Sequence, residues 1–158
     1  MKNKRFKEKI EKYLKRQFGV TIDSASKRQV YEALMSTIRE DLSEKKFAYE
    51  QELKKTRQKR AYYMSMEFLV GRTLRNNLFN LDLEKDVREY FADNGISLDE
   101  IYDIEPDPGL GNGGLGRLAS CYLDALTSSD YPVTGFSILY EYGIFKQVIN
   151  NGWQQEFP

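Results

Sequence analysis

Residues 109–118 read GLGNGGLGRL and place five glycines within eight positions, directly before an apolar pattern with helical spacing. Glycine lacks a Cβ atom, so its backbone can approach a ligand closely and can adopt positive φ without strain. The helix that follows, expected to end near Ser128, begins with unpaired N–H groups and a partial positive charge. The stretch therefore predicts a cradle for an anion, most often a phosphate.

The spacing G-x-G-x-x-G occurs twice in this stretch, starting at Gly109 and at Gly111. A dinucleotide-binding loop leaves a strand directly, whereas residues 105–108 (EPDP) contain two prolines that disfavour regular structure. No Lys-Ser or Lys-Thr pair follows the glycines, so the stretch is not the P-loop of nucleoside triphosphatases. Two alternatives to the phosphate cradle remain: a dinucleotide-binding Rossmann module, with Glu141 on the ribose, and a tight turn that serves helix packing.

The composition is that of a folded protein of ordinary domain size. The 158 residues are 41% hydrophobic and 13% aromatic, and 24 basic side chains balance 24 acidic ones. This balance argues against a dedicated nucleic-acid binder. No apolar run reaches membrane-spanning length and the N-terminal residues are charged, so we expect neither a membrane segment nor a signal peptide. The single cysteine, Cys121, fits a reducing cytoplasm and, on an apolar helix, is expected to be buried.

Histidine is absent from the sequence. Catalytic triads with histidine, an imidazole base and zinc sites with histidine ligands are therefore excluded, and we expect no metal site. Catalysis would have to use backbone dipoles, carboxylates or groups that this chain does not supply.

The hydrophobic periodicities predict the α/β class. Apolar residues at helical spacing predict a helix over residues 6–14, and Ser26 with Gln29 forms the capping box of a second helix that runs to Thr56. The other expected elements are a strand at 61–68, one or two helices over 74–90, a short helix from 97, the helix after the glycines, a strand at 133–139, and a hairpin of 144–149 with 153–157 across an Asn-Gly turn. A sheet of so few strands would have unpaired edges. We therefore expect the chain to be the front part of a larger domain.

Two side chains outside the glycines are candidates for the site. Glu67 ends an aromatic strand, where its carboxylate is either a site group or the anchor of the adjacent turn at 71–72. Arg117 lies on a polar stripe that also contains Ser120 and Asp124. Arg117 either adds positive charge near the glycine loop or bonds loop carbonyls or Asp124.

Three segments, in order and with compatible spacing, resemble the α-1,4-glucan phosphorylases (glycogen, starch and maltodextrin phosphorylase). They are residues 62–74 (YYMSMEFLVGRTL), 108–124 (PGLGNGGLGRLASCYLD), and 140–147 (YEYGIFKQ) together with 152–154 (GWQ). The resemblance runs from about residue 26 to the end. By this resemblance the chain is an N-terminal fragment of a family member. The alternative is a non-catalytic fragment, the product of a truncated gene.

The resemblance implies a fold class that is α/β, with N-terminal helices followed by the first part of a Rossmann-like domain. That domain would belong to a two-domain glycosyltransferase fold of the GT-B type, incomplete in this chain. Residues 1–60 would form the N-terminal helical segment and residues 61–158 the start of the N-terminal Rossmann-like domain, while the C-terminal cofactor domain is absent. An incomplete sheet leads us to expect that the isolated chain is inactive and is marginally stable or prone to aggregation.

The activity implied by the resemblance is phosphorolysis of terminal α-1,4-linked glucose to glucose 1-phosphate. The family is cytoplasmic and usually homodimeric, and it binds pyridoxal 5′-phosphate on a lysine of the C-terminal domain. No covalent cofactor residue and no catalytic residue is therefore assigned to this chain. The resemblance places Gly113 and Gly114 near the phosphates and Leu115 near the glucose. The residues assigned to substrate and phosphate binding are Asn112, Gly113, Gly114 and Leu115, with Glu67 and Arg117 in support.

The resemblance also bears on whether nucleotides regulate the enzyme. The aromatic positions of the nucleotide-activator site in regulated animal members fall on Lys46 and Lys54 of this sequence. A lysine side chain offers no ring for stacking on a base. The resemblance therefore predicts an unregulated enzyme of the bacterial type.

Overall fold

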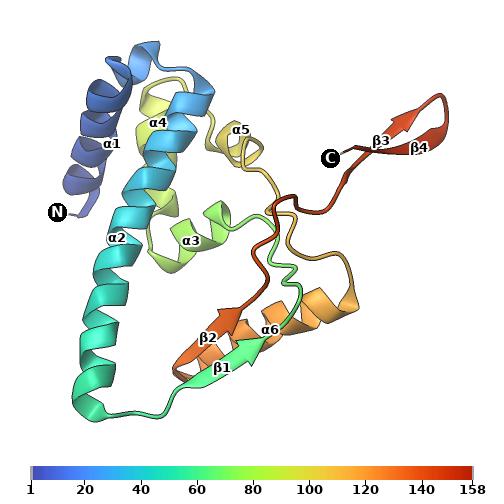
Figure 1. The fold of residues 1–158 in the computed structure, drawn as a ribbon. Coiled ribbons are helices and arrows are strands. Elements are labelled where there is room, and N and C mark those ends of the chain that lie inside the picture. The colour runs from blue at the N-terminus through green and yellow to red at the C-terminus, as the bar shows by residue number, and fades with distance from the viewer. Residues whose placement is uncertain (1, 158) are drawn as a thin grey trace. The chain divides into compact units, whose positions relative to one another are not determined.

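A computed structural model of the chain describes residues 2–157 and separates into two compact units (Figure 1). The first unit comprises Met1–Lys55 and Arg72–Pro106, and the second comprises Thr56–Gly71 and Asp107–Pro158. Residues 72–106 thus pack with the N-terminal helices, and the units do not follow the expected segments 1–60 and 61–158. That division concerns the domains of a complete protein and stays a prediction.

The first unit is helical. Its elements are α1 (Lys2–Phe18), the short 3-10 helix η1 (Ile22–Ser24), α2 (Lys27–Thr56), α3 (Leu74–Asn80), α4 (Glu84–Asp93) and α5 (Leu98–Tyr102). These helices enclose an apolar core, since one face of each longer helix repeats apolar residues every three or four positions. The largest fully buried side chains of this core are Ile10, Leu14, Val30, Leu34, Ile38, Leu74, Leu78, Val87, Phe91, Leu98 and Ile101.

The boundary between α1 and α2 follows the local sequence. Gly19 adopts φ +68°, a conformation that a residue with a side chain rarely takes, and α1 ends directly before it. At the start of α2, the N–H of Ser26 donates to Oε1 of Gln29 over 2.8 Å, and the N–H of Gln29 donates to Oγ of Ser26 over 3.3 Å. The predicted capping box is therefore confirmed.

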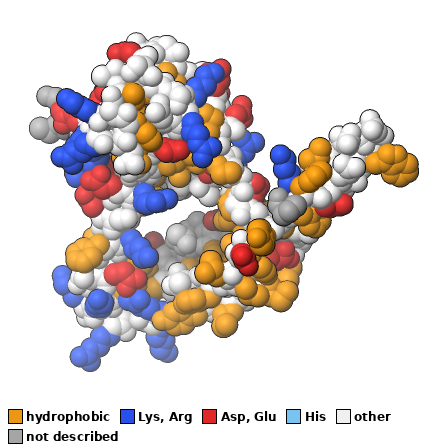
Figure 2. Space-filling model, turned by 45° about the horizontal axis from the view of Figure 1, so that its top comes forward, with side chains coloured by type: hydrophobic (Ala, Val, Ile, Leu, Met, Phe, Trp, Pro, Cys, Tyr) orange, Lys and Arg blue, Asp and Glu red, His pale blue; other side chains and the backbone are white. Residues whose placement is uncertain are grey.

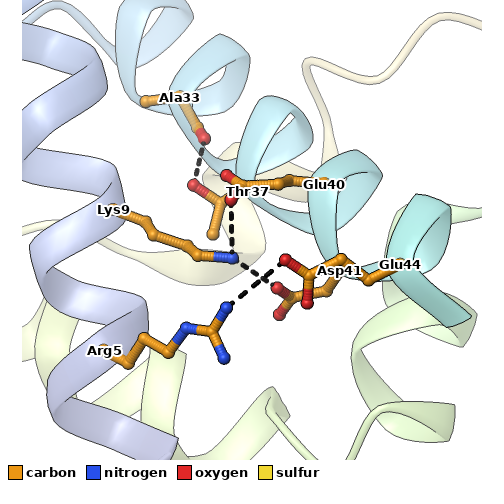
Figure 3. A network of polar contacts seen from close by, with 7 residues as sticks. All are labelled: Arg5, Lys9, Ala33, Thr37, Glu40, Asp41 and Glu44. Carbon is orange, nitrogen blue, oxygen red and sulfur yellow. Dashed lines mark hydrogen bonds and ion pairs between the residues drawn. The ribbon is translucent and has the colours of Figure 1, made fainter.

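Ion pairs join α1 to α2 at one edge of this core (Figure 3). Nζ of Lys9 lies 2.6 Å from Oδ1 of Asp41 and 3.1 Å from Oε1 of Glu40, and Arg5 pairs with Glu44 at 3.4 Å. Burial acts to lower the pKa of Lys9, but the hydrogen bonds and charges of Asp41 and Glu40 outweigh it and raise this pKa above its ordinary value. Lys9 therefore stays charged where the two helices meet.

The second unit contains the strands. Strand β1 (Ala61–Met64) pairs in parallel with β2 (Val133–Phe136), and the chain between them includes α6 (Gly114–Ser128), which contacts β2. Strands β3 (Lys146–Asn150) and β4 (Trp153–Phe157) form an antiparallel hairpin. Its turn has Asn151 at φ 51° and Gly152 at φ 81°, so the hairpin expected from the Asn-Gly pair is confirmed. The mixture of helices with a small parallel sheet agrees with the predicted α/β class.

Strand β1 is shorter than predicted, ending at Met64 rather than at residue 68. Directly after it the hydroxyl of Ser65 donates to the carbonyl of Glu67 over 2.8 Å and accepts the N–H of Glu67 over 3.3 Å. This local turn competes with the ladder and bends the chain away from the sheet.

The orientation of α6 differs from the prediction in two respects. The face with Gly116, Ala119 and Ser120 is buried, and the hydroxyl of Ser120 donates to the carbonyl of Gly116 over 3.1 Å. Ser120 therefore does not belong to an exposed polar stripe. Cys121 is exposed, so the predicted buried thiol is wrong. Both errors have one cause: the small residues of α6 pack inward, whereas Leu115, Leu118 and Tyr122 are exposed.

Two general findings complete the fold. Within residues 2–157, no helix combines the length and the apolar character needed to cross a bilayer. Over the same residues, no group of three or more His, Cys, Asp or Glu side chains is arranged to hold a metal ion.

Candidate functional site

The glycine loop enters α6 from irregular chain. The residues directly before Gly109 form no strand, so the strand-to-loop entry that a dinucleotide-binding loop requires is missing there. Gly109 has φ +63°, its N–H donates to Oδ1 of Asp107 over 3.1 Å, and its carbonyl accepts the N–H of Ile144 over 2.9 Å. Gly113 is the N-cap of α6 in an extended conformation, with its carbonyl accepting the N–H of Arg117 over 2.9 Å.

Both ends of the loop are bonded to the segment that follows β1. The N–H of Phe68 donates to the carbonyl of Leu110 over 2.9 Å, and the N–H of Leu69 donates to the carbonyl of Gly116 over 3.0 Å. A Cβ on Gly111 would lie 2.4 Å from the nitrogen of Leu69, closer than any real contact. Gly111 is therefore a glycine because two backbones meet at it.

Glu67 binds the middle of the same loop. Its Oε2 accepts the N–H of Asn112 over 2.9 Å, and its side chain is half-buried. A Cβ on Gly116 would lie 3.1 Å from Cδ of Glu67, so the carboxylate lies against the first turn of α6. Glu67 therefore contacts the glycine loop.

Arg117 contacts the segment that follows β1, a partner that neither sequence-based alternative named. Its Nη1 donates to the carbonyl of Leu69 over 3.5 Å, and the side chain is exposed. The guanidinium thus bonds a backbone carbonyl of the segment after β1 rather than Asp124. This contact adds to the bonds that hold α6 against that segment.

Gly113 and Gly114 differ from the other glycines of the loop. Both are exposed, neither has a positive φ, and a Cβ on either would meet no atom within 4 Å. Neither the local conformation nor the packing of this unit therefore requires glycine at these positions. The amides of Gly114 and Leu115 lie in the first turn of α6, where no earlier helical carbonyl can accept them. Leu115 is itself 57% exposed, so this first turn is open to solvent.

A hollow of about 230 Å³ lies beside the loop. It is lined by Glu67, Gly109, Leu110, Gly111, Asn112, Tyr140, Tyr142, Gly143 and Ile144. The hydroxyl of Tyr140 donates to the carbonyl of Met66 over 3.0 Å, which holds its ring at this wall. A carboxylate, backbone polar groups and two aromatic rings thus surround one small space, a combination suited to a small polar ligand.

The structure brings some predicted residues together and adds others. Glu67 and Asn112 share a hydrogen bond, and Asn112 adjoins the open pair Gly113 and Gly114. Reasoning from single residues did not select Tyr140 and Tyr142, which the hollow adds. Their signal in the sequence was the resemblance of segment 140–147 to a family segment.

Comparisons with known proteins agree with that resemblance. Residues 91–158 match the carbohydrate phosphorylase family. The chain is 44% identical over 138 residues to the glycogen phosphorylase of Chlamydia trachomatis serovar D, covering 87% of this chain and 17% of that protein. It is 46% identical over 132 residues to the glycogen phosphorylase of Synechocystis sp. and 45% identical over 132 residues to the brain form of Bos taurus, in each case covering 84% of this chain and 16% of the relative. The 158 residues therefore belong to the carbohydrate phosphorylase family and span 16–17% of the length of these curated relatives.

Proposed function

We propose that this chain is the N-terminal part of an α-1,4-glucan phosphorylase with two Rossmann-like domains of the GT-B type. The complete protein would transfer a terminal α-1,4-linked glucose of a glucan to inorganic phosphate. In that reaction the bond between C1 of the glucose and the chain oxygen breaks, a phosphate oxygen bonds to C1, and the leaving oxygen takes a proton. Support comes from the family membership and from relatives that are named glycogen phosphorylases.

The role proposed for this chain is to bind phosphate and glucose through Asn112, Gly113, Gly114 and Leu115. One observation carries this proposal: Gly113 and Gly114 have open space where a Cβ would lie and no positive φ, so the fold of this unit does not demand them. A ligand that approaches the backbone closely would demand them. The amides at the start of α6 suit an anion, because they are unpaired donors at the positive end of the helix.

The cofactor would be held mainly outside this chain. Pyridoxal 5′-phosphate in the family is attached to a lysine of the C-terminal domain, and its phosphate group supplies proton transfer when bound. The open amides at Gly113 and Gly114 fit a phosphate group on the cofactor or on the substrate. This chain would then orient phosphate and stabilise charge through fixed backbone dipoles, without a side-chain acid.

The other properties proposed for the complete protein follow from the resemblance. It would be a cytoplasmic homodimer that acts on an α-1,4-glucan and inorganic phosphate and is not controlled by nucleotides. The 158 residues alone would be inactive, since no lysine among them is assigned to the cofactor. Glucose 1-phosphate formed by the purified chain alone would contradict that part of the proposal.

The proposal is tested by substituting the two open glycines in the complete protein. Gly113→Ala and Gly114→Ala add a methyl group that meets no protein atom. Gly114 lies in the first turn of α6, where alanine is favourable, so the melting temperature of Gly114→Ala should stay the same or rise slightly. Gly113 is the N-cap, where alanine is disfavoured, so Gly113→Ala should lower the melting temperature slightly. The methyl group would obstruct a phosphate at the amides, and the KM for phosphate should rise about ten-fold.

Two results would contradict the proposed function. One is a complete wild-type protein that forms no glucose 1-phosphate from glucan and phosphate. The other is a KM for phosphate that stays within about two-fold in both alanine variants. A titration with NAD on the same proteins tests the dinucleotide alternative, which the missing strand before Gly109 disfavours.

A further inference from the structure

We propose that Glu67 is a positioning residue, which fixes the middle of the glycine loop so that the amides of Gly113 and Gly114 stay open. Glu67 acts through Asn112 and need not touch the phosphate itself. The inference rests on the proposed function, because it explains how this chain keeps its anion-binding amides available.

Between Leu110 and Gly116, the segment that follows β1 holds the loop at three points, and only one of these contacts comes from a side chain of that segment. Backbone hydrogen bonds to the carbonyls of Leu110 and Gly116 fix the two ends, at 2.9 and 3.0 Å. Five residues lie between these points, and backbone bonds at the ends alone leave such a span several conformations. The bond from Asn112 N–H to Oε2 of Glu67, at 2.9 Å, fixes the peptide that precedes the open glycines.

The side chain of Glu67 is itself held in place. Its backbone is bonded on both sides by the hydroxyl of Ser65, at 2.8 and 3.3 Å. Its carboxylate lies against Gly116, where an added Cβ would come within 3.1–3.2 Å of Cγ, Cδ and Oε2. Gly116 therefore admits the carboxylate to the first turn of α6, and the side chain has little freedom to leave Asn112.

The charge of Glu67 and its hydrogen bond have opposite consequences for an arriving phosphate. A carboxylate beside the first turn of α6 repels a second anion, whereas the hydrogen bond to Asn112 holds the loop in its open form. A positioning role requires the acceptor oxygen and not the charge. Glu67→Gln keeps an acceptor oxygen and removes the charge, while Glu67→Ala removes both.

The experiment measures phosphorolysis by the complete protein with wild-type, Glu67→Ala and Glu67→Gln sequences. In Glu67→Ala the KM for phosphate should rise about ten-fold, because a charged hydrogen bond that orders the loop is lost, while the KM for glucan stays within about two-fold. In Glu67→Gln the KM for phosphate should rise only about two- to three-fold. Hydrogen exchange of the Asn112 amide should accelerate about ten-fold in Glu67→Ala and less in Glu67→Gln.

Glu105→Ala is the matched control. The carboxylate of Glu105 also accepts backbone amides, from Thr73 at 2.7 Å and from Leu74 at 3.0 Å, but it lies in the helical unit. Its loss should lower the melting temperature and the active fraction without raising the KM for phosphate. A structural role alone would make Glu67→Ala behave like this control.

The outcomes separate this inference from the proposed function. A Glu67→Ala protein that keeps both the wild-type KM for phosphate and the wild-type exchange of the Asn112 amide would overturn the inference, as would a Glu67→Gln protein as impaired as Glu67→Ala. A wild-type protein without phosphorolysis would overturn the proposed function. In that case the exchange of the Asn112 amide still decides whether Glu67 positions the loop.

Discussion

The two compact units differ in how they bury apolar side chains. The helical unit contains the entire core cluster, with Phe91, Leu34 and Ile10 among its fully buried members. In the described part of the second unit the buried apolar side chains are Phe68, Ala119 and Pro132, whereas Leu139 is 98% exposed and Met64 82% exposed. Exposed hydrophobic side chains gather on parts of the molecular surface in Figure 2.

The unit with the larger apolar core is therefore not the unit that contains the candidate site. A closed core of interlocking helices supports itself, whereas a two-stranded sheet with one helix is too small to close a core. The residues proposed to bind phosphate lie in the less buried unit, on a loop held by specific polar contacts. Hydrogen bonds and close backbone contacts, rather than apolar burial, thus define the candidate site. Single substitutions can test this difference between the two units, because each one removes either apolar burial or one polar or backbone contact.

The largest effect is expected from a cavity in the helical core. Leu34 is fully buried, and Leu34→Ala should lower the free energy of unfolding of the helical unit by about 3 kcal/mol. Urea unfolding followed by circular dichroism at a helical wavelength measures this change. A loss below 1 kcal/mol would mean that the core of this unit is not close-packed.

A smaller effect is expected where two backbones meet in the second unit. Gly111→Ala places a Cβ within 2.4–2.7 Å of backbone atoms of Phe68 and Leu69, which cannot rotate away. The added methyl group should push the loop away from this segment and lower the free energy of unfolding of the second unit by about 2 kcal/mol. The loop would then be held less firmly at the candidate site. Hydrogen exchange of the Leu69 amide, which donates to Gly116, reports the separation. Unchanged exchange would show that the close approach at Gly111 does not hold the loop.

A still smaller change in stability is expected from the loss of one polar contact in the helical unit. The hydroxyl of Tyr90 donates to Oε1 of Glu11 over 2.6 Å, and burial, followed by this hydrogen bond, raises the pKa of Tyr90 above its ordinary value. The folded state thus binds the phenolic proton more tightly than the unfolded state, so the contribution is full below about pH 10 and is lost as the pH rises further.

Tyr90→Phe should therefore lower the stability of the helical unit by about 1 kcal/mol at pH 8. It should also reduce the fall in stability between pH 9 and about 11, which urea titrations at both values measure. An identical fall in both proteins would show that another group causes it.

The smallest effect is expected on the exposed face of α6. Leu118 is 48% exposed, and Leu118→Ala should change the free energy of unfolding by less than about 0.5 kcal/mol. Paired with Leu34→Ala, this variant measures the contrast between the units with the same change of side chain. In a complete protein, a loss above 2 kcal/mol for Leu118→Ala would instead identify this face as covered by other parts of the chain.

Local sequence signals predicted the features that depend on neighbouring residues. The capping box of Ser26 with Gln29 and the turn at Asn151 and Gly152 both need only a few adjacent positions, and both are confirmed. The exposure of Cys121 and the burial of Ser120 depend on which face of α6 packs inward. That choice follows from the contact of Gly116 with the segment after β1, which hydrophobic periodicity does not record.

The candidate site shows the same limit. The glycine pattern alone did not distinguish Gly111, which packs against backbone, from Gly113 and Gly114, which face open space. The family resemblance selected Gly113 and Gly114 but gave no structural reason for the choice. The partner of Glu67 is Asn112, 45 residues later, and no local pattern connects them. The family resemblance named both residues for the site without pairing them, and the hydrogen bond between them comes from the structure.

The central claim is that the amides of Gly113 and Gly114 receive a phosphate group, and a crystal structure of the complete protein with bound phosphate tests it most directly. We expect a phosphate oxygen about 2.9 Å from the nitrogen of one or both glycines, with Oε2 of Glu67 still bound to Asn112. A phosphate bound elsewhere, with these two amides turned toward protein atoms, would contradict it.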